Sequence, residues 1–318
     1  MAIVQLDSFY ANQAYQLWDK LLHTHSCHYK PIHKDQFLTK FLPQDQIHSW
    51  VYLEDDIVIG FISVVTVKER IKAYLSMIMV DPKHQRQGIG SKLLDYAEHF
   101  IKGCNLYPSL DLVFFNPVQF EWIIPNTNQH DHPNAPGVEI NSPAYHFFTK
   151  QGYQVFAKQN SYYKLIKDYT FNSSIRLLID ELHKHKITIT FYDADKHHGF
   201  NDLFDDLKNP YWKEEILKAV MYHEPVLIAE KEGLMLGFTG PLRVQSSLRG
   251  YFAGIGVHSK IRGLGIGKVL FASLCMELKT LGAHYMTLFT GETNPARKIY
   301  ENEGFTIVCS WANMRKEF

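Results

Sequence analysis

One sequence pattern occurs twice in this chain, as "VDPKHQRQGIGSKLL" (Val80–Leu94) and as "VHSKIRGLGIGKVLF" (Val257–Phe271). Each copy follows an apolar run and contains a short polar turn, a Gly-x-Gly pair and apolar residues at helical spacing. Apolar runs before a turn predict a strand, and apolar residues at helical spacing after it predict a helix. Self-similarity at this separation indicates two copies of one domain rather than a short repeat.

The sequences that follow the two copies also correspond. "SLDLVFF" (Ser109–Phe115) and "HYMTLFT" (His284–Thr290) are typical of buried strands. "SPAYHFFTKQGY" (Ser142–Tyr153) and "NPARKIYENEGF" (Asn294–Phe305) are helical segments that end in Gly and an aromatic residue. The order strand, glycine turn, helix, strand, helix is therefore expected in both halves.

A chain of 318 residues is long enough for two domains of about 150 residues each. We place them at residues 1–168 and 169–318. The first half is about 25 residues longer between its glycine turn and its final Gly-aromatic pair. The extra residues form an inserted loop at 116–141, which is rich in Pro, Asn and His and has no periodicity. Long loops in compact domains often carry function.

Composition limits the classes of partner. Lys plus Arg and Asp plus Glu both number 33, so we expect no nucleic-acid or membrane partner. The start of the sequence resembles neither a signal peptide nor a membrane span, and we expect a cytoplasmic protein. We expect neither disulfides nor a zinc site from the four separated cysteines, which are Cys27, Cys104, Cys275 and Cys309.

The glycine turns predict a phosphate-binding site. A helix that opens after glycines presents its first N–H groups and the positive end of its dipole to an oxygen-rich ligand. The dinucleotide fingerprint G-x-G-x-x-G does not match Gly263–Gly267, and the phosphate-binding loop G-x-x-x-x-G-K-[ST] fails because Val269 follows Lys268. Both common nucleotide motifs are therefore excluded by spacing.

The pattern [QR]-x-x-G-x-[GA] after a strand resembles the acyl-coenzyme A loop of the GNAT superfamily of N-acetyltransferases, and the resemblance extends over nearly the whole chain as two tandem domains. It implies an α/β (α+β) fold in which each domain has a mixed, mostly antiparallel sheet flanked by helices, with a V-shaped splay between the two central parallel strands. It also implies acetyl-CoA as co-substrate, and we expect no metal. The residues that the resemblance assigns to coenzyme A are Met79, Val80, Gln85, Arg86, Gln87, Gly88, Ile89 and Gly90 in the first half, and Ile255, Val257, Arg262, Gly263, Leu264, Gly265, Ile266, Gly267, Lys268 and Asn294 in the second.

The same resemblance implies direct attack of a neutral amine on the thioester and protonation of the leaving thiolate. The family commonly supplies the acid as a Tyr four residues before the final Gly, where the second half has Tyr300 and the first has Phe148. We therefore predict that the C-terminal domain is catalytic, with Tyr145 as an alternative acid in the first half. Glu292 is the predicted general base, with His258 or a water relay as alternatives.

The predicted function is transfer of an acetyl group from acetyl-CoA to a primary amine of a small molecule or peptide. The alternative is a non-catalytic acyl-CoA-binding sensor or regulatory protein. The N-terminal domain is then a second enzyme, a coenzyme-binding regulator or a structural partner. We expect a monomer whose two domains form an intramolecular pseudo-dimer, and a solvated loop rather than a metal site at His130, Asp131 and His132.

Overall fold

The computed structural model describes residues 2–23 and 28–318, and its contacts divide the chain into two units. The first unit comprises residues up to Asn160 together with Cys309–Phe318, and the second comprises Ser161–Val308. These limits differ from 1–168 and 169–318 because the last ten residues pack within the first unit. Cys27 lies outside the described residues, and the other three cysteines are free.

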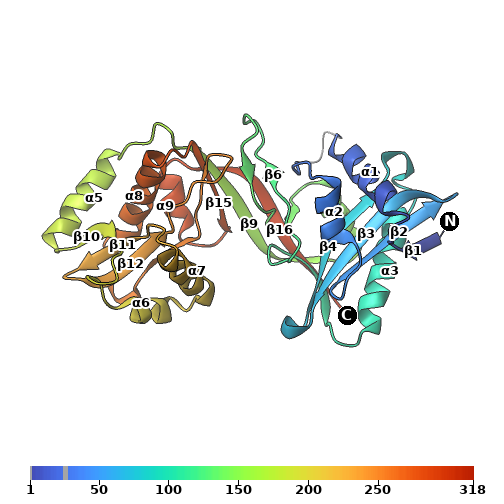
Figure 1. The fold of residues 1–318 in the computed structure, drawn as a ribbon, viewed down its shortest axis with the longest axis horizontal. Coiled ribbons are helices and arrows are strands. Elements are labelled where there is room, and N and C mark those ends of the chain that lie inside the picture. The colour runs from blue at the N-terminus through green and yellow to red at the C-terminus, as the bar shows by residue number, and fades with distance from the viewer. Residues whose placement is uncertain (1, 24–27) are drawn as a thin grey trace. The chain divides into compact units, whose positions relative to one another are not determined.

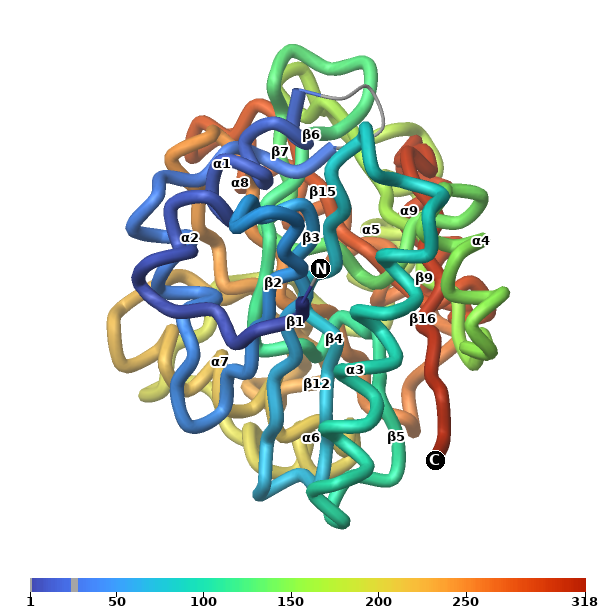
Figure 2. Tube along the Cα trace, turned by 90° about the vertical axis from the view of Figure 1, so that its right-hand side faces the viewer, coloured from blue at the N-terminus to red at the C-terminus, as the bar shows by residue number. Residues whose placement is uncertain are grey.

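The first unit is a sheet with helices on both faces, and each of its helices buries one apolar stripe (Figures 1 and 2). Residues of α1 and α2 form a core with one face of the strands, and residues of α3 and α4 form a second core with the other face. Its elements are β1 (Ala2–Gln5), α1 (Ala11–Leu22), α2 (Lys34–Phe41), β2 (Ile47–Glu54), β3 (Ile57–Val67), β4 (Lys72–Val80), α3 (Ile89–Gly103), β5 (Ser109–Leu112), β6 (Trp122–Ile123), β7 (Asp131–His132), β8 (Val138–Glu139), α4 (Pro143–Lys150) and the first part of β9 (Gln154–Leu165).

The strand order in this unit is β1-β2-β3-β4-β5 followed by β16 (Thr306–Glu317), the last strand of the chain. All neighbours in this order are antiparallel except β4 and β5, which are parallel. Met314 of β16 lies opposite Leu112, and Arg315 lies opposite Asp111. Arg315 donates two hydrogen bonds to the buried Asp111 carboxylate, at 2.7 and 2.8 Å. A bidentate ion pair thus joins the final strand to β5.

The second unit repeats this plan, with α5, α8 and α9 contributing to one core and α6 and α7 to another (Figure 1). The extra helix is α5, which lies between β9 and β10 in the chain. Its elements are α5 (Ser173–Lys184), β10 (Thr188–Phe191), α6 (Phe200–Leu207), α7 (Pro210–Met221), β11 (Leu227–Lys231), β12 (Leu234–Gly240), β13 (Arg249–Gly250), β14 (Gly254–Val257), α8 (Ile266–Thr280), β15 (Tyr285–Gly291) and α9 (Arg297–Asn302).

Antiparallel strands in the order β10-β11-β12-β14 form one sheet of the second unit. Outside this four-stranded sheet, β15 lies between β9 and β13 and is parallel to β13. The end of β9 belongs to this unit, where the Tyr162 hydroxyl lies 2.9 Å from Glu301 Oε1. The mixed α/β fold expected from the sequence is confirmed, with mostly antiparallel pairing in both units.

We predict that Asp111→Ala lowers the free energy of unfolding of the protein by about 2–4 kcal/mol, because it leaves Arg315 without its carboxylate partner at a mostly buried position. The matched control is Glu214→Ala, which removes an exposed ion pair with Lys218 at 2.7 Å and should leave the unfolding midpoint unchanged. Urea unfolding followed by circular dichroism measures both. Equal midpoints for the two variants would contradict the importance of the Asp111–Arg315 pair.

Candidate functional site

The glycine loop of the first unit joins β4 to α3. Arg86 and Gly88 have positive φ angles of 62° and 82°, and Gly88 begins α3 without a side-chain cap. The Gln85 side-chain amide donates to the Val80 carbonyl at 3.1 Å and so ties the loop to the end of the strand. The first N–H groups of a helix have no partner inside it, so this loop offers donors and the helix dipole to an anion. These features fit a pyrophosphate.

The loop of the second unit has the same conformation at corresponding positions. Gly263 and Gly265 have φ angles of 95° and 81°, and Gly265 begins α8 without a side-chain cap. The Arg262 guanidinium donates to the Val257 carbonyl at 3.2 Å, as Gln85 does to Val80 in the first unit. The sequence repeat is therefore also a repeat of backbone shape.

The two loops differ in what covers them. A Cβ atom built on Gly88 would have no neighbour within 4 Å. A Cβ atom built on Gly265 would lie 2.8 Å from a methyl group of Leu178, which comes from α5. The extra helix of the second unit thus places an apolar side chain against its glycine loop, whereas the loop of the first unit is open.

The other residues assigned to coenzyme A differ in how exposed they are. The side chains of Met79, Ile89 and Ile266 are buried. Asn294 is exposed, and its side chain accepts a hydrogen bond from the backbone N–H of Ala296 at 2.9 Å. Exposed side chains occur at Arg86, Gln87, Leu264 and Lys268, and partly exposed residues at Val80, Gly90, Ile255, Val257 and Gly267.

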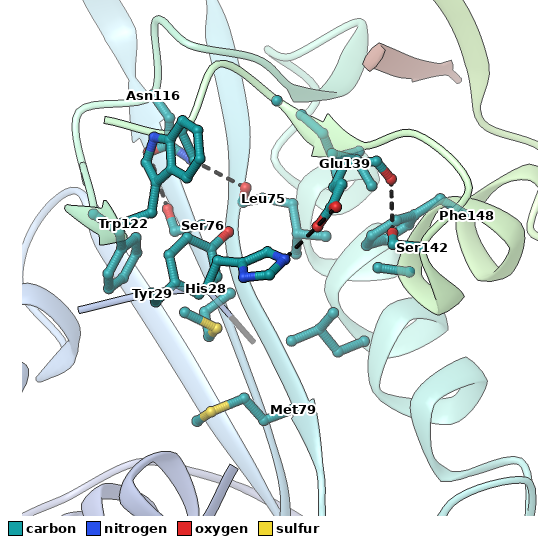
Figure 3. Close-up of a pocket in the computed structure, with 18 of the residues that line it drawn as sticks. His28, Tyr29, Leu75, Ser76, Met79, Asn116, Trp122, Glu139, Ser142 and Phe148 are labelled. Carbon is teal, nitrogen blue, oxygen red and sulfur yellow. Dashed lines mark hydrogen bonds and ion pairs between the residues drawn. The ribbon is translucent and has the colours of Figure 1, made fainter. Parts of the chain in front are cut away.

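A pocket of about 360 Å³ lies in the first unit (Figure 3). Its walls come from α1, β4, β5, the inserted segment, the start of α4 and β16. Val80 and Gln85, which belong to the strand end and glycine loop, line the pocket together with His28 and Glu139. One cavity therefore connects the predicted coenzyme loop with titratable side chains.

The pocket lies where β4 and β5 stop pairing. Their last paired residues are Tyr74 and Asp111, although β4 continues to Val80. Ser76 is an extra residue in the pairing of β4 with β3, because Met77 and Leu75 face consecutive residues of β3. Such a bulge bends a strand and increases its twist. The parallel pair therefore ends early, and side chains from both strands line the pocket.

Asn116 holds this opening in place. Its side-chain amide donates to the Leu75 carbonyl at 3.0 Å, and its side-chain oxygen accepts from the Ser76 hydroxyl at 3.1 Å and from the Val118 backbone at 2.9 Å. The residue is buried, so these bonds satisfy polar groups that would otherwise lack partners where the strands separate. Asn116 is also the first residue of the predicted inserted loop.

His28 and Glu139 face one another inside the pocket (Figure 3). The imidazole Nε2 lies 3.8 Å from the Glu139 carboxylate, and each side chain is about one third exposed, at 36% and 34%. Burial, followed by the charge of Glu139, raises the pKa of the neighbouring Cys309 thiol to about 12. The thiol donates to the Ser310 carbonyl at 4.0 Å. An imidazole and a carboxylate that solvent can reach form a pair suited to general acid–base chemistry.

The inserted segment is folded against the rest of the first unit. Lys30 contacts Glu121 at 2.7 Å and Asp131 at 2.8 Å, and these hydrogen bonds, that to Asp131 most strongly, raise its pKa. The ring of Trp122 packs against Trp311 with a centroid separation of 5.0 Å. These contacts hold the insertion where it forms one wall of the pocket.

The expectation of a solvated loop at residues 130–132 is wrong for Asp131 and His132. Both are buried, because Asp131 pairs with Lys30 and the His132 ring lies 2.9 Å from the Asn134 carbonyl.

Within residues 2–23 and 28–318, no group of three or more His, Cys, Asp or Glu side chains is arranged to hold a metal ion. In the same residues, no helix has the length and apolar character needed to cross a membrane.

The comparison with protein families decides the assignment. The model of the acetyltransferase (GNAT) family matches residues 14–117 and 188–305, one segment in each half. The chain belongs to the GNAT family. A search of curated proteins found no match.

Solved structures resemble the whole chain. A GCN5-related glucosamine N-acetyltransferase region of a fungal multi-domain GH3 β-N-acetylglucosaminidase has 18% identity and a TM-score of 0.70, over 99% of this chain and 38% of the fungal chain. A GCN5-related N-acetyltransferase from Sphaerobacter thermophilus has 14% identity and a TM-score of 0.62, over 99% and 95% of the two chains. A tandem GNAT protein from the clavulanic acid biosynthesis pathway has 13% identity and a TM-score of 0.59, over 99% and 98%. The tandem GNAT arrangement is thereby confirmed.

In the second GNAT unit, Tyr300 lies inside the core. Its side chain is 5% exposed and contacts the rings of Phe252 and Phe271, with centroids 5.9 and 4.9 Å away. Burial raises its pKa strongly. Glu292 is exposed just after β15, and His258 lies 4.0 Å from Asp206.

In the first GNAT unit, Phe148 lines the pocket at the position that corresponds to Tyr300, and the alternative acid Tyr145 is partly buried and packs against the core of α3 and α4. Sequence reasoning did not single out His28, Asn116 or Glu139. The signal that could have found Asn116 and Glu139 is the insertion itself, since both lie close to its ends.

We predict that Gly88→Ala and Gly265→Ala each cost about 1 kcal/mol of stability, because alanine disfavours positive φ. Gly265→Ala should cost about 1 kcal/mol more, because its Cβ must displace Leu178. Adding Leu178→Ala should remove this excess, which a double-mutant cycle of urea unfolding measures. A zero coupling energy between positions 265 and 178 would show that Leu178 does not cover the loop.

Proposed function

We propose that this protein transfers the acetyl group of acetyl-CoA to a primary amine and that the first unit carries out the reaction. The supporting observation is a pocket that Gln85 of the open glycine loop lines together with His28 and Glu139. A concave site with a few convergent polar groups is the usual form of a small-molecule site. The sequence favoured the C-terminal half because of Tyr300, but the buried position of Tyr300 and the contact of Leu178 with Gly265 favour the first unit.

In this proposal, the backbone N–H groups at Gln85–Gly90 bind the pyrophosphate of coenzyme A. The open position at Gly88 and the uncapped start of α3 fit that role. The backbone of Met79 and Val80 contacts the pantetheine arm, which enters the V-shaped gap between β4 and β5. Acetyl-CoA supplies the activated acyl group as a thioester. The corresponding residues of the second unit, Ile255–Lys268 and Asn294, form a coenzyme site only when Leu178 moves away.

His28 accepts a proton from the substrate ammonium. Glu139 attracts the positive charge of that ammonium and orients the His28 imidazole. The neutral amine then attacks the thioester carbonyl, and a carbon–nitrogen bond replaces the carbon–sulfur bond. The amine loses a second proton when the amide forms, and this proton passes to the leaving thiolate. A tyrosine at the position of Phe148 is therefore not required in the first unit. A non-catalytic acyl-CoA-binding sensor would not need a proton acceptor beside the coenzyme loop.

We predict that His28→Asn and Glu139→Gln lower kcat about 100-fold or more while the KM for acetyl-CoA stays unchanged, because they remove proton transfer and not coenzyme binding. Tyr300→Phe should leave kcat unchanged. Coenzyme A release with 2-phenylethylamine, glucosamine and spermidine as acceptors provides the assay. Loss of turnover in Tyr300→Phe alone would place catalysis in the second unit, and Glu292→Gln would then test its base.

A second prediction concerns the coenzyme loop. Gly88→Asp and Gly88→Asn are matched in size, and both residues tolerate positive φ, but only aspartate places a negative charge beside the pyrophosphate. Gly88→Asp should weaken acetyl-CoA binding about tenfold relative to Gly88→Asn, as measured by isothermal titration calorimetry. The same pair at Gly265 should differ little. A large difference at Gly265 and none at Gly88 would assign the coenzyme site to the second unit.

A further inference from the structure

The pocket of the first unit contains few charged groups. Among the described residues that line it, Glu139 is the only carboxylate and His28 is the only histidine, and there is no lysine or arginine. A buried charge on a ligand needs a partner of opposite charge. The described lining can therefore pair one ammonium group with Glu139, but it offers no lysine or arginine to a carboxylate or phosphate and no second carboxylate to another ammonium.

The neutral polar side chains of Asn116, Gln119 and Ser142 are already bonded within the protein, whereas the Trp18 indole N–H, which also lines the pocket, has no hydrogen-bond partner among the described residues. Asn116 bridges Leu75, Ser76 and Val118, and Gln119 donates to the carbonyls of Phe114 and Asn116. The Ser142 hydroxyl, beside Glu139, donates to the Glu139 carbonyl at 2.7 Å. These groups stabilise the opening of the strands and the start of α4. A ligand with several hydroxyl groups would compete with these bonds for the same donors and acceptors.

Aromatic rings form the pocket wall made by α1, the segment after it and the insertion. The centroids of Trp18 and Phe120 are 5.5 Å apart, those of Tyr29 and Phe120 are 5.3 Å apart, and those of Trp18 and Tyr29 are 5.9 Å apart. All three residues line the pocket together with Met77 and Met79. Rings at these separations present edges and faces against which another flat ring packs well. The same wall also suits the apolar body of an amine that carries its charge at one end.

Resting on the acetyl transfer proposed above, we infer that the acceptor is a primary monoamine with an uncharged aromatic body, such as an arylalkylamine. Its ammonium group faces Glu139 and His28. Its ring packs against Trp18, Tyr29 and Phe120. This inference separates the acceptor of this chain from amino acids, polyamines and sugars, because the described lining has no lysine or arginine for a carboxylate, no second carboxylate for a further ammonium and few free polar groups for several hydroxyls.

The test is a panel of acceptors that differ from one another by one feature, assayed by coenzyme A release with the full chain. 2-Phenylethylamine is the reference, phenylalanine adds a carboxylate, 2-cyclohexylethylamine removes aromaticity, spermidine adds charges, and glucosamine replaces the apolar body by hydroxyl groups. We expect kcat/KM to fall about 100-fold for phenylalanine and about tenfold or more for spermidine and glucosamine, with a smaller fall for the cyclohexyl compound. Glucosamine or spermidine as the best acceptor would overturn the inference and leave acetyl transfer in place.

A binding measurement separates failure of the acceptor class from failure of the proposed function. Isothermal titration of 2-phenylethylamine into the protein saturated with coenzyme A should show binding, and no binding would overturn the inference. Binding without turnover would support the acceptor class and contradict catalysis. Tyr29→Leu should raise the KM for 2-phenylethylamine about fivefold and leave the KM for acetyl-CoA unchanged, whereas Tyr29→Phe should restore the original value. An unchanged KM in Tyr29→Leu would remove Tyr29 from the acceptor wall.

Discussion

The early end of the pairing between β4 and β5 is the constraint on which the candidate site depends. Two parallel strands that part leave backbone groups without partners, and buried polar groups of this kind are costly. The Asn116 side chain offsets this cost because it forms hydrogen bonds with Leu75, Ser76 and Val118 where the strands separate. On the other side of β5, the ion pair of Asp111 with Arg315 fixes the final strand. This strand carries Trp311, and Trp311 pairs with Glu139 of β8, so both pocket residues depend on the position of the final strand.

Much of this architecture can be predicted from the sequence because it depends on local patterns. The glycines at positions 88 and 265 predict a turn with positive φ in each loop, and the apolar spacing after them predicts the two helices. The family assignment rests on the same local features and is confirmed by the family model. The insertion at 116–141 could be located by comparison of the two halves, but the sequence did not predict that it is folded against the first unit.

The remaining features depend on contacts between residues far apart in the chain. Nothing local to residues 309–318 indicates that they pack with the first unit. The cover of Gly265 by Leu178 needs the packing of α5 on α8, and the meeting of His28 with Glu139 needs both α1 and the insertion in place. Tyr300 matches the position of a family acid in sequence, but its aromatic neighbours determine its burial. Sequence similarity between the two halves therefore predicts that the glycine loops share one conformation, but it does not predict how open each loop is to a ligand.

The central claim is that acetyl-CoA binds at the open loop of the first unit. Hydrogen–deuterium exchange of the full chain, with and without acetyl-CoA, tests it directly because the backbone N–H groups of the loops are the proposed ligands. The account predicts slower exchange at residues 76–91 and no change at residues 254–268. Protection confined to residues 254–268 would contradict it and return the active site to the second unit.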